Sequence, residues 1–150
     1  MDFDDWGEIG RILSYMIPVI IFLLINVFFK KQQEQKRRLA VVRGLLSDID
    51  YNQNLIEASS YQRQMRKFKT KTWKSNQGKM DYISPDLYSN LSDTFGIAAE
   101  LNREIDTAKK HKLVSYMAGL QTNRLRKPLD KCKQGLEAWL VVNKDKKKAD

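Results

Sequence analysis

The feature that most constrains this chain is an apolar run near its start. Residues 12–29 read ILSYMIPVIIFLLINVFF and carry no formal charge. As a helix these 18 residues span about 27 Å, which matches the roughly 30 Å hydrocarbon core of a bilayer once Ile9 and Gly10 are added. Pro18 is compatible with this assignment because a single proline in a membrane helix is compensated locally. We therefore predict a transmembrane helix over residues 12–29.

A cleaved signal peptide and a buried core helix are the alternatives to an anchor here. Signal peptides begin with a basic segment and end at a small-residue cleavage site. In this chain the first residues, MDFDDWGE, are acidic, and VFFKKQQ offers no such site. A core helix with so long an apolar run would need a much larger protein around it. The sequence therefore favours an uncleaved anchor.

The charges that flank the run predict its orientation. The preceding tail, residues 1–11, holds four acids and one base. Five cations follow the run closely: Lys30, Lys31, Lys36, Arg37 and Arg38. The positive-inside rule then places the N-terminus outside and the rest of the chain in the cytoplasm, at the cell inner (plasma) membrane. We expect these five cations to contact anionic lipid headgroups.

Charge also suggests the partners of the larger C-terminal part. The chain holds 27 Lys and Arg against 18 Asp and Glu, a net charge of +9. Because the first 29 residues hold one base and four acids, residues 30–150 carry 26 bases and 14 acids. Such an excess favours anionic partners, namely lipid headgroups, nucleic acid or an acidic protein face.

Helical periodicity covers most of residues 30–143, which we predict to form a basic helical cytoplasmic domain. Apolar positions alternate by three and four residues, as in an amphipathic helix or short coiled coil. This first stripe is Leu39, Val42, Leu46, Ile49, Gln53 and Ile56. A kink or turn is expected near residues 58–60. A second stripe then follows one residue out of register: Tyr61, Met65, Phe68 and Thr72.

A later helix has the clearest start signal in the chain. Ser84 followed by Pro85 reads as an N-cap and the first helical position. A last helix is predicted from the spacing of Leu125, Leu129, Cys132, Leu136 and Trp139. Residues 109–123 are ambiguous, and residues 144–150 read as a charged, disordered tail. The predicted fold class is all-α: one N-terminal transmembrane helix followed by a cytoplasmic antiparallel bundle of three or four helices.

The stretch from Phe68 to Asn102 resembles a known group of proteins. The residues that carry the resemblance are Phe68, Thr70, Trp73, Gly78, Leu87, Leu91, Phe95 and Asn102. They are similar to a loose pattern in uncharacterised prokaryotic single-pass membrane proteins with a cytoplasmic helical domain. In that group a Trp closes one helix, a Gly-containing turn follows, and a long helix carries spaced Leu, aromatic and Asn residues. The resemblance implies the same architecture and no known activity.

A cluster of cations in residues 62–76, QRQMRKFKTKTWKSN, is the candidate partner surface. These six cations, called the basic strip below, are Arg63, Arg66, Lys67, Lys69, Lys71 and Lys74. Phe68 and Trp73 lie among them, and phosphate contacts with base stacking would suit single-stranded nucleic acid. The alternative, which we favour, places Phe68 and Trp73 in the core as structural residues and leaves the cations solvated. A helix from residue 30 to about 58 would end about 42 Å from the bilayer, beyond electrostatic reach of the lipids.

The remaining chemistry-bearing residues point away from an enzyme. His111 is the single histidine and reads as a residue at a helix end, and Cys132 lies on an apolar stripe. The sequence has no Gly-rich phosphate loop, H-E-x-x-H motif or Cys pair. We therefore expect no catalytic, cofactor-binding or metal-binding site.

Together these features predict a membrane-anchored, non-enzymatic interaction or scaffold module. Its basic domain would dock an acidic protein partner or form a homo-oligomer at the cytoplasmic membrane face. The alternatives are a membrane-tethered nucleic-acid-binding protein and a small accessory subunit of a larger membrane complex.

Overall fold

The computed structural model describes residues 5–58, 66–111 and 121–149, and side chains at 14–58, 66–111 and 121–144. The chain divides into two compact units, Met1–Arg38 and Leu39–Asp150; the second is called the helical domain below. Helix α1 (Asp5–Glu57) begins in the first unit and ends in the second. The other elements belong to the helical domain: α3 (Lys71–Asn76), η1 (Gln77–Lys79), α4 (Pro85–Lys110), η2 (Thr122–Leu125) and α6 (Arg126–Ala149). Every regular element in these ranges is helical, which confirms the all-α prediction.

The part of α1 that lies in the helical domain buries one face. Its buried side chains are Leu39, Val42, Leu45, Asp48, Ile49, Asn52, Leu55 and Ile56. Four residues of the predicted stripe, Leu39, Val42, Ile49 and Ile56, are buried, whereas Leu46 and Gln53 are only partly buried. Asn52, a polar residue, joins the buried face, and its side chain is paired with the backbone of Lys69.

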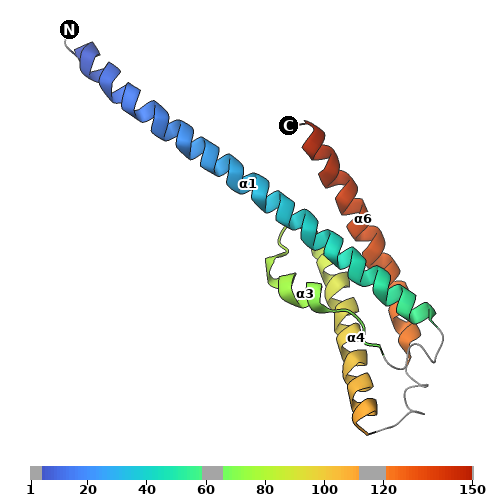
Figure 1. Ribbon diagram of the computed structural model, residues 1–150. Coiled ribbons are helices and arrows are strands. Elements are labelled where there is room, and N and C mark those ends of the chain that lie inside the picture. Colours follow the sequence, from blue (N-terminus) through green and yellow to red (C-terminus); the bar gives the residue numbers. More distant parts are fainter. Residues whose placement is uncertain (1–4, 59–65, 112–120, 150) are drawn as a thin grey trace. The chain divides into compact units, whose positions relative to one another are not determined.

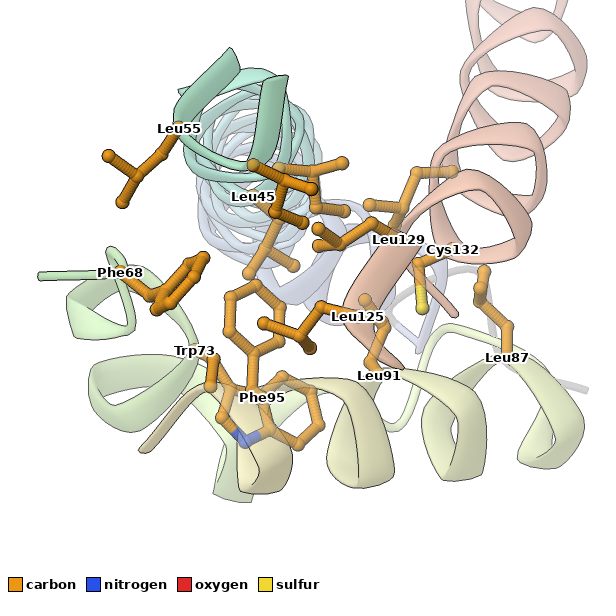
Figure 2. Packing of buried hydrophobic residues seen from close by; sticks show 14 of the residues in the cluster. Leu45, Leu55, Phe68, Trp73, Leu87, Leu91, Phe95, Leu125, Leu129 and Cys132 are labelled. Atoms are coloured by element: carbon orange, nitrogen blue, oxygen red, sulfur yellow. The ribbon is translucent and has the colours of Figure 1, made fainter. Parts of the chain in front are cut away.

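Helix α4 supplies the opposite wall of the core. The Ser84 hydroxyl accepts a hydrogen bond from the Leu87 N–H at 3.3 Å, and Pro85 is the first helical residue. The cap and the fixed φ of proline start the helix where its apolar spacing begins. From there α4 buries Leu87, Leu91, Thr94, Phe95, Ala98, Leu101, Ile105 and Ala108. Figure 2 shows several of these side chains facing Leu45 of α1, Leu125 of η2 and Leu129 of α6.

Paired residues fix the directions of the helices inside the domain. Thr94 of α4 lies 3.3 Å from the Cys132 sulfur of α6, and Asp50 of α1 lies 2.7 Å from Lys133 of α6. Gln53 contacts Asp130, so residue numbers rise along α1 as they fall along α6. Helix α6 therefore runs antiparallel to both α1 and α4, and these two run in the same direction (Figure 1). The sequence predicts a further helix between these two, and in an antiparallel bundle the first and third helices share a direction, as α1 and α4 do.

The connection from α1 to α4 first returns along α1. Residues 66–70, called the strap below, are not helical, although the spacing of Tyr61, Met65, Phe68 and Thr72 predicted a helix there. Helix α3 begins only at Lys71. Tyr61, Met65 and most of the expected kink near 58–60 lie outside the described residues.

Two further expectations concern the ends of α4 and α6. Helix α4 ends at Lys110, with His111 as its C-cap, and residues 112–120 of the ambiguous segment lie outside the described part. Helix α6 includes Pro128 in its first turn and extends to Ala149. It thus runs through most of the 144–150 segment, for which the sequence predicts disorder.

Two helical glycines test how tightly α4 and α6 pack. A Cβ at Gly135 would lie 2.6 Å from Leu87 Cδ1, whereas one at Gly96 would meet nothing within 4 Å. We expect Gly96→Ala to raise the free energy of unfolding by about 1 kcal/mol, since alanine is the better helix former. Gly135→Ala should lower it by about 1 kcal/mol, because displacing Leu87 costs more than the helix gains. Urea unfolding of the full chain in mild detergent, followed by circular dichroism, measures both; equal effects would contradict the described packing.

Candidate functional site

The apolar run forms an exposed surface on the first part of α1. Every large apolar side chain from Tyr15 to Phe29 is 48–77 % exposed. Pro18 lies inside this helix without ending it. Within the described residues, α1 is the one helix long and apolar enough to cross a membrane. A surface of this kind is unfavourable in water, because contiguous apolar patches on soluble monomers are small.

The cations that follow the apolar surface are mostly open to solvent. Lys30, Lys31, Lys36 and Arg37 are exposed. Arg38 is partly buried, and its Nε lies 3.3 Å from the Glu34 carboxylate one helical turn earlier. Exposed surface pairs of this kind contribute little to stability. The positive charge of Lys30, Lys31, Lys36 and Arg37 lies open to anions outside the chain.

The strap is held by two asparagines, one from each of two helices. Asn52 of α1 accepts a hydrogen bond from the Lys69 N–H at 2.7 Å and donates one to the Lys69 carbonyl at 2.9 Å. Asn102 of α4 does the same for Phe68, with both distances 2.8 Å. An asparagine side chain carries both a donor and an acceptor, so each one replaces a backbone partner completely. This is why the strap needs no helix to satisfy its backbone.

These contacts divide the basic strip into two parts. Lys67 Nζ lies 2.6 Å from the Asp106 carboxylate, and Lys69 Nζ lies 4.4 Å from the centre of the Tyr51 ring. Both cations therefore have intramolecular partners. The other described members of the strip, Arg66, Lys71 and Lys74, have exposed side chains. Arg63 lies outside the described residues.

The aromatic residues of the strip belong to the core. Phe68 is 4 % exposed and Trp73 is 5 % exposed. The Trp73 ring stacks on Phe95, with centroids 5.7 Å apart and planes 6° apart, and meets Tyr88 at 5.3 Å. Figure 2 shows Trp73 beside Phe95 beneath the α1 residues. Neither ring is open to a nucleic-acid base in this arrangement.

Residues after the strap continue its return along α1. The Thr72 N–H donates to the Asp48 carboxylate at 3.3 Å, and the Thr72 methyl group lies 3.1 Å from the Cβ position of Gly44. From Lys69 to Thr72 the chain thus runs from the level of Asn52 to the level of Gly44 on α1. Gly44 is nearer the start of the helical domain. The sequence argument placed the whole strip at the far end of a helix; the return of the chain corrects that placement for Lys71 and Lys74.

Cys132 is the one thiol of the chain, and burial raises its pKa above the usual range. A neutral thiol packed against Thr94 is a poor nucleophile.

Between α4 and α6 lies an open cavity of about 310 Å³, lined mainly by polar and charged residues that include Asp93, Lys127 and Lys131. In the described ranges no three His, Cys, Asp or Glu side chains gather in a metal-binding arrangement.

Sequence reasoning assigned no role to Asp48 or Asp106, and it did not find that Asn52 holds the strap. A polar residue within an apolar stripe is the signal that could have marked Asn52, and Asn102 carries the same signal within the resemblance motif. The Asp106 pairing with Lys67 gave no such signal, because both residues are ordinary surface charges in sequence. Their roles depend on where the strap lies, which only the folded chain shows.

Comparisons with known proteins identify no relative of this chain. No family model matches the chain, and neither the curated proteins nor the solved structures contain a match. The resemblance of residues 68–102 to prokaryotic single-pass membrane proteins therefore stays a prediction.

Proposed function

We propose that this chain is a single-pass membrane protein whose helical domain acts at the cytoplasmic face as a non-enzymatic interaction module. The observation that carries the proposal is the exposed apolar surface from Tyr15 to Phe29, followed directly by cations. Burial in lipid removes the cost of that surface in water. The positive-inside rule supports an outside N-terminus and a cytoplasmic domain at the inner membrane.

The helical domain supports a binding role rather than a chemical one. The polar side chains that make close contacts in this domain make them within the chain. Asn52 and Asn102 hydrogen-bond to the backbone of the strap, and Asp106 pairs with Lys67. The exposed side chain of Arg66 offers charge to an acidic protein face or to an acidic region of a second copy. An acidic protein partner or a homo-oligomer is therefore the proposed occupant, and an accessory subunit of a membrane complex would use the same surface.

Two arginines in the middle of the apolar surface should abolish anchoring. Each arginine at the centre of a membrane helix costs about 2.5–3.5 kcal/mol on insertion scales. We expect the wild-type chain to stay in the membrane pellet after alkaline carbonate extraction, and Ile20→Arg/Leu24→Arg to be released or degraded. The matched control, Gln32→Arg/Gln33→Arg, adds the same charge just outside the surface and should stay in the pellet. Release of the wild-type chain would contradict the proposal.

Topology and partner class need separate measurements. Protease added outside intact cells should leave a C-terminal tag uncut; digestion of the tag would reverse the proposed orientation.

Oligonucleotide titration of the detergent-solubilised chain at rising salt separates protein docking from nucleic-acid binding. A log–log slope steeper than about −4 would indicate several phosphate contacts and favour the nucleic-acid alternative. The burial of Trp73 and Phe68 leads us to expect no such slope.

A further inference from the structure

The C-terminal part of α6 presents an apolar and basic surface that the core does not use. Val141 and Val142 are 62 % and 57 % exposed, although Trp139 and Leu140 just before them pack against the core. Lys144 follows, and the sequence continues with Asp145 and three lysines, Lys146, Lys147 and Lys148. Exposed valines next to a run of lysines are typical of helices that lie in a membrane interface.

The helix register places this surface at the end of the domain that contains Leu39. Asp50 pairs with Lys133 at 2.7 Å, and α6 runs antiparallel to α1. At 1.5 Å per residue, Val141 and Val142 therefore lie about 12–14 Å from this pair in the direction of Leu39. We call this part of the helical domain the Leu39 end. Leu39 is covalently joined to the apolar surface of α1 through residues 30–38.

A second group of cations lies at the same end. The segment after the strap reaches Gly44 through Thr72, and the Trp139 Nε1–H donates to the Tyr82 carbonyl at 3.2 Å. The intervening chain, α3 and η1, runs between these two contacts and therefore lies at the Leu39 end of the domain. Its exposed cations are Lys71, Lys74 and Lys79, and Asp81 is the one acid between Lys71 and Ser84.

We propose that the Leu39 end of the helical domain docks on an anionic lipid surface. The exposed part of α6 supplies Val141, Val142 and Lys144 for this contact, and α3 with η1 supplies further lysines. The proposal rests on the membrane anchoring proposed above. It assigns anionic lipid as the partner of the lysines of α6, α3 and η1, which are not needed for anchoring itself. Arg66 is not part of this lipid-facing group, because it lies at the start of the strap, before the chain runs back along α1.

Charge and connectivity favour lipid over the other occupants of this surface. The four lysines from Lys144 to Lys148 oppose one acid, so two copies placed face to face would repel each other. Each lysine close to an anionic leaflet strengthens attachment by about fivefold. The covalent link through residues 30–38 also keeps the Leu39 end close to the bilayer, which raises the effective concentration of lipid headgroups.

A fluorescent label at position 142 tests the docking in the full chain. The label is carried on Val142→Cys in a Cys132→Ala background, and the chain is reconstituted in phosphatidylcholine vesicles with or without phosphatidylserine. With phosphatidylserine, we expect a blue-shifted emission and at least a twofold loss of intensity to a lipid-borne quencher. Without it, the label should stay in water. The control label, on Thr107→Cys of α4 at the opposite end, should stay in water in both vesicles.

Charge removal gives the matched variant. Replacing Lys144, Lys146, Lys147 and Lys148 by glutamine should abolish the quenching with phosphatidylserine while the chain stays carbonate-resistant. No quenching at 142 in the inserted wild-type chain would overturn lipid docking. Equal quenching in both vesicles would overturn the role of anionic headgroups, and either result would leave the anchoring intact. If the blue shift of the label depends on the number of chains per vesicle and the lipid-borne quencher has no effect, the surface contacts a second copy. That result would also overturn lipid docking. Loss of carbonate resistance in the wild type would overturn the anchoring instead.

Discussion

Replacing Trp73 with alanine is expected to lower the free energy of unfolding by about 3–5 kcal/mol, the usual cost of removing a buried aromatic ring. Trp73 is 5 % exposed, and its ring stacks on Phe95 and contacts Tyr88. Alanine would leave a cavity between α3 and α4 that the surrounding helices cannot fill. Urea unfolding of the full chain in mild detergent, followed by circular dichroism at 222 nm, measures the change.

The neighbouring variant Lys74→Ala is the matched control for this prediction. Lys74 is exposed on the same short helix, so its removal should change the free energy of unfolding by less than about 0.5 kcal/mol. A Trp73→Ala variant that is as stable as Lys74→Ala, but no longer binds an oligonucleotide, would contradict the core assignment. That result would instead make Trp73 a stacking platform for bases.

The elements that the sequence predicts well are those with local signals. Helix α4 is one, because Ser84, Pro85 and the apolar spacing that follows lie within a few residues of one another. The apolar surface of α1 is another, since no element other than a long helix accommodates so many consecutive apolar residues. Helix α6 follows from the spacing of Leu125, Leu129 and Cys132, all of which are buried.

The strap could not be predicted in the same way, because its partners are distant in sequence. Phe68 and Thr72 share a helical spacing, and periodicity alone therefore favours a helix. The backbone of Phe68 and Lys69 is satisfied instead by Asn102 and Asn52, which lie 34 and 17 residues away. Local rules contain no information about such pairings, so the non-helical strap stayed hidden.

The candidate partner surface shows the same limit. Sequence reasoning treated the six cations of the basic strip as one group. The folded chain separates them, because Lys67 meets Asp106, Lys69 meets Tyr51, and Lys71 and Lys74 follow the return toward Gly44. The positive charge was predictable from composition, but its division between intramolecular contacts and open surface depends on the path of the strap.

The strap itself gives the second large effect, because Asn52 is a fully buried polar side chain that serves backbone groups alone. In Asn52→Ala, the Lys69 N–H and carbonyl both lose their partner. Each buried polar group left unsatisfied costs about 1–3 kcal/mol, so we expect the free energy of unfolding to fall by about 2–4 kcal/mol. Urea unfolding measures the loss, and hydrogen exchange should show that the Lys69 amide is no longer protected.

The matched control lies half a turn away on the same helix. Asn54 has an exposed side chain, so Asn54→Ala makes the same chemical change without uncovering a buried group. Asn102→Ala should resemble Asn52→Ala and expose the Phe68 amide to exchange. Because both asparagines hold one strap, the double variant should lose less stability than the two single losses added together. Additive losses, or an Asn52→Ala variant as stable as Asn54→Ala, would show that the strap is held by its apolar contacts and not by the asparagines.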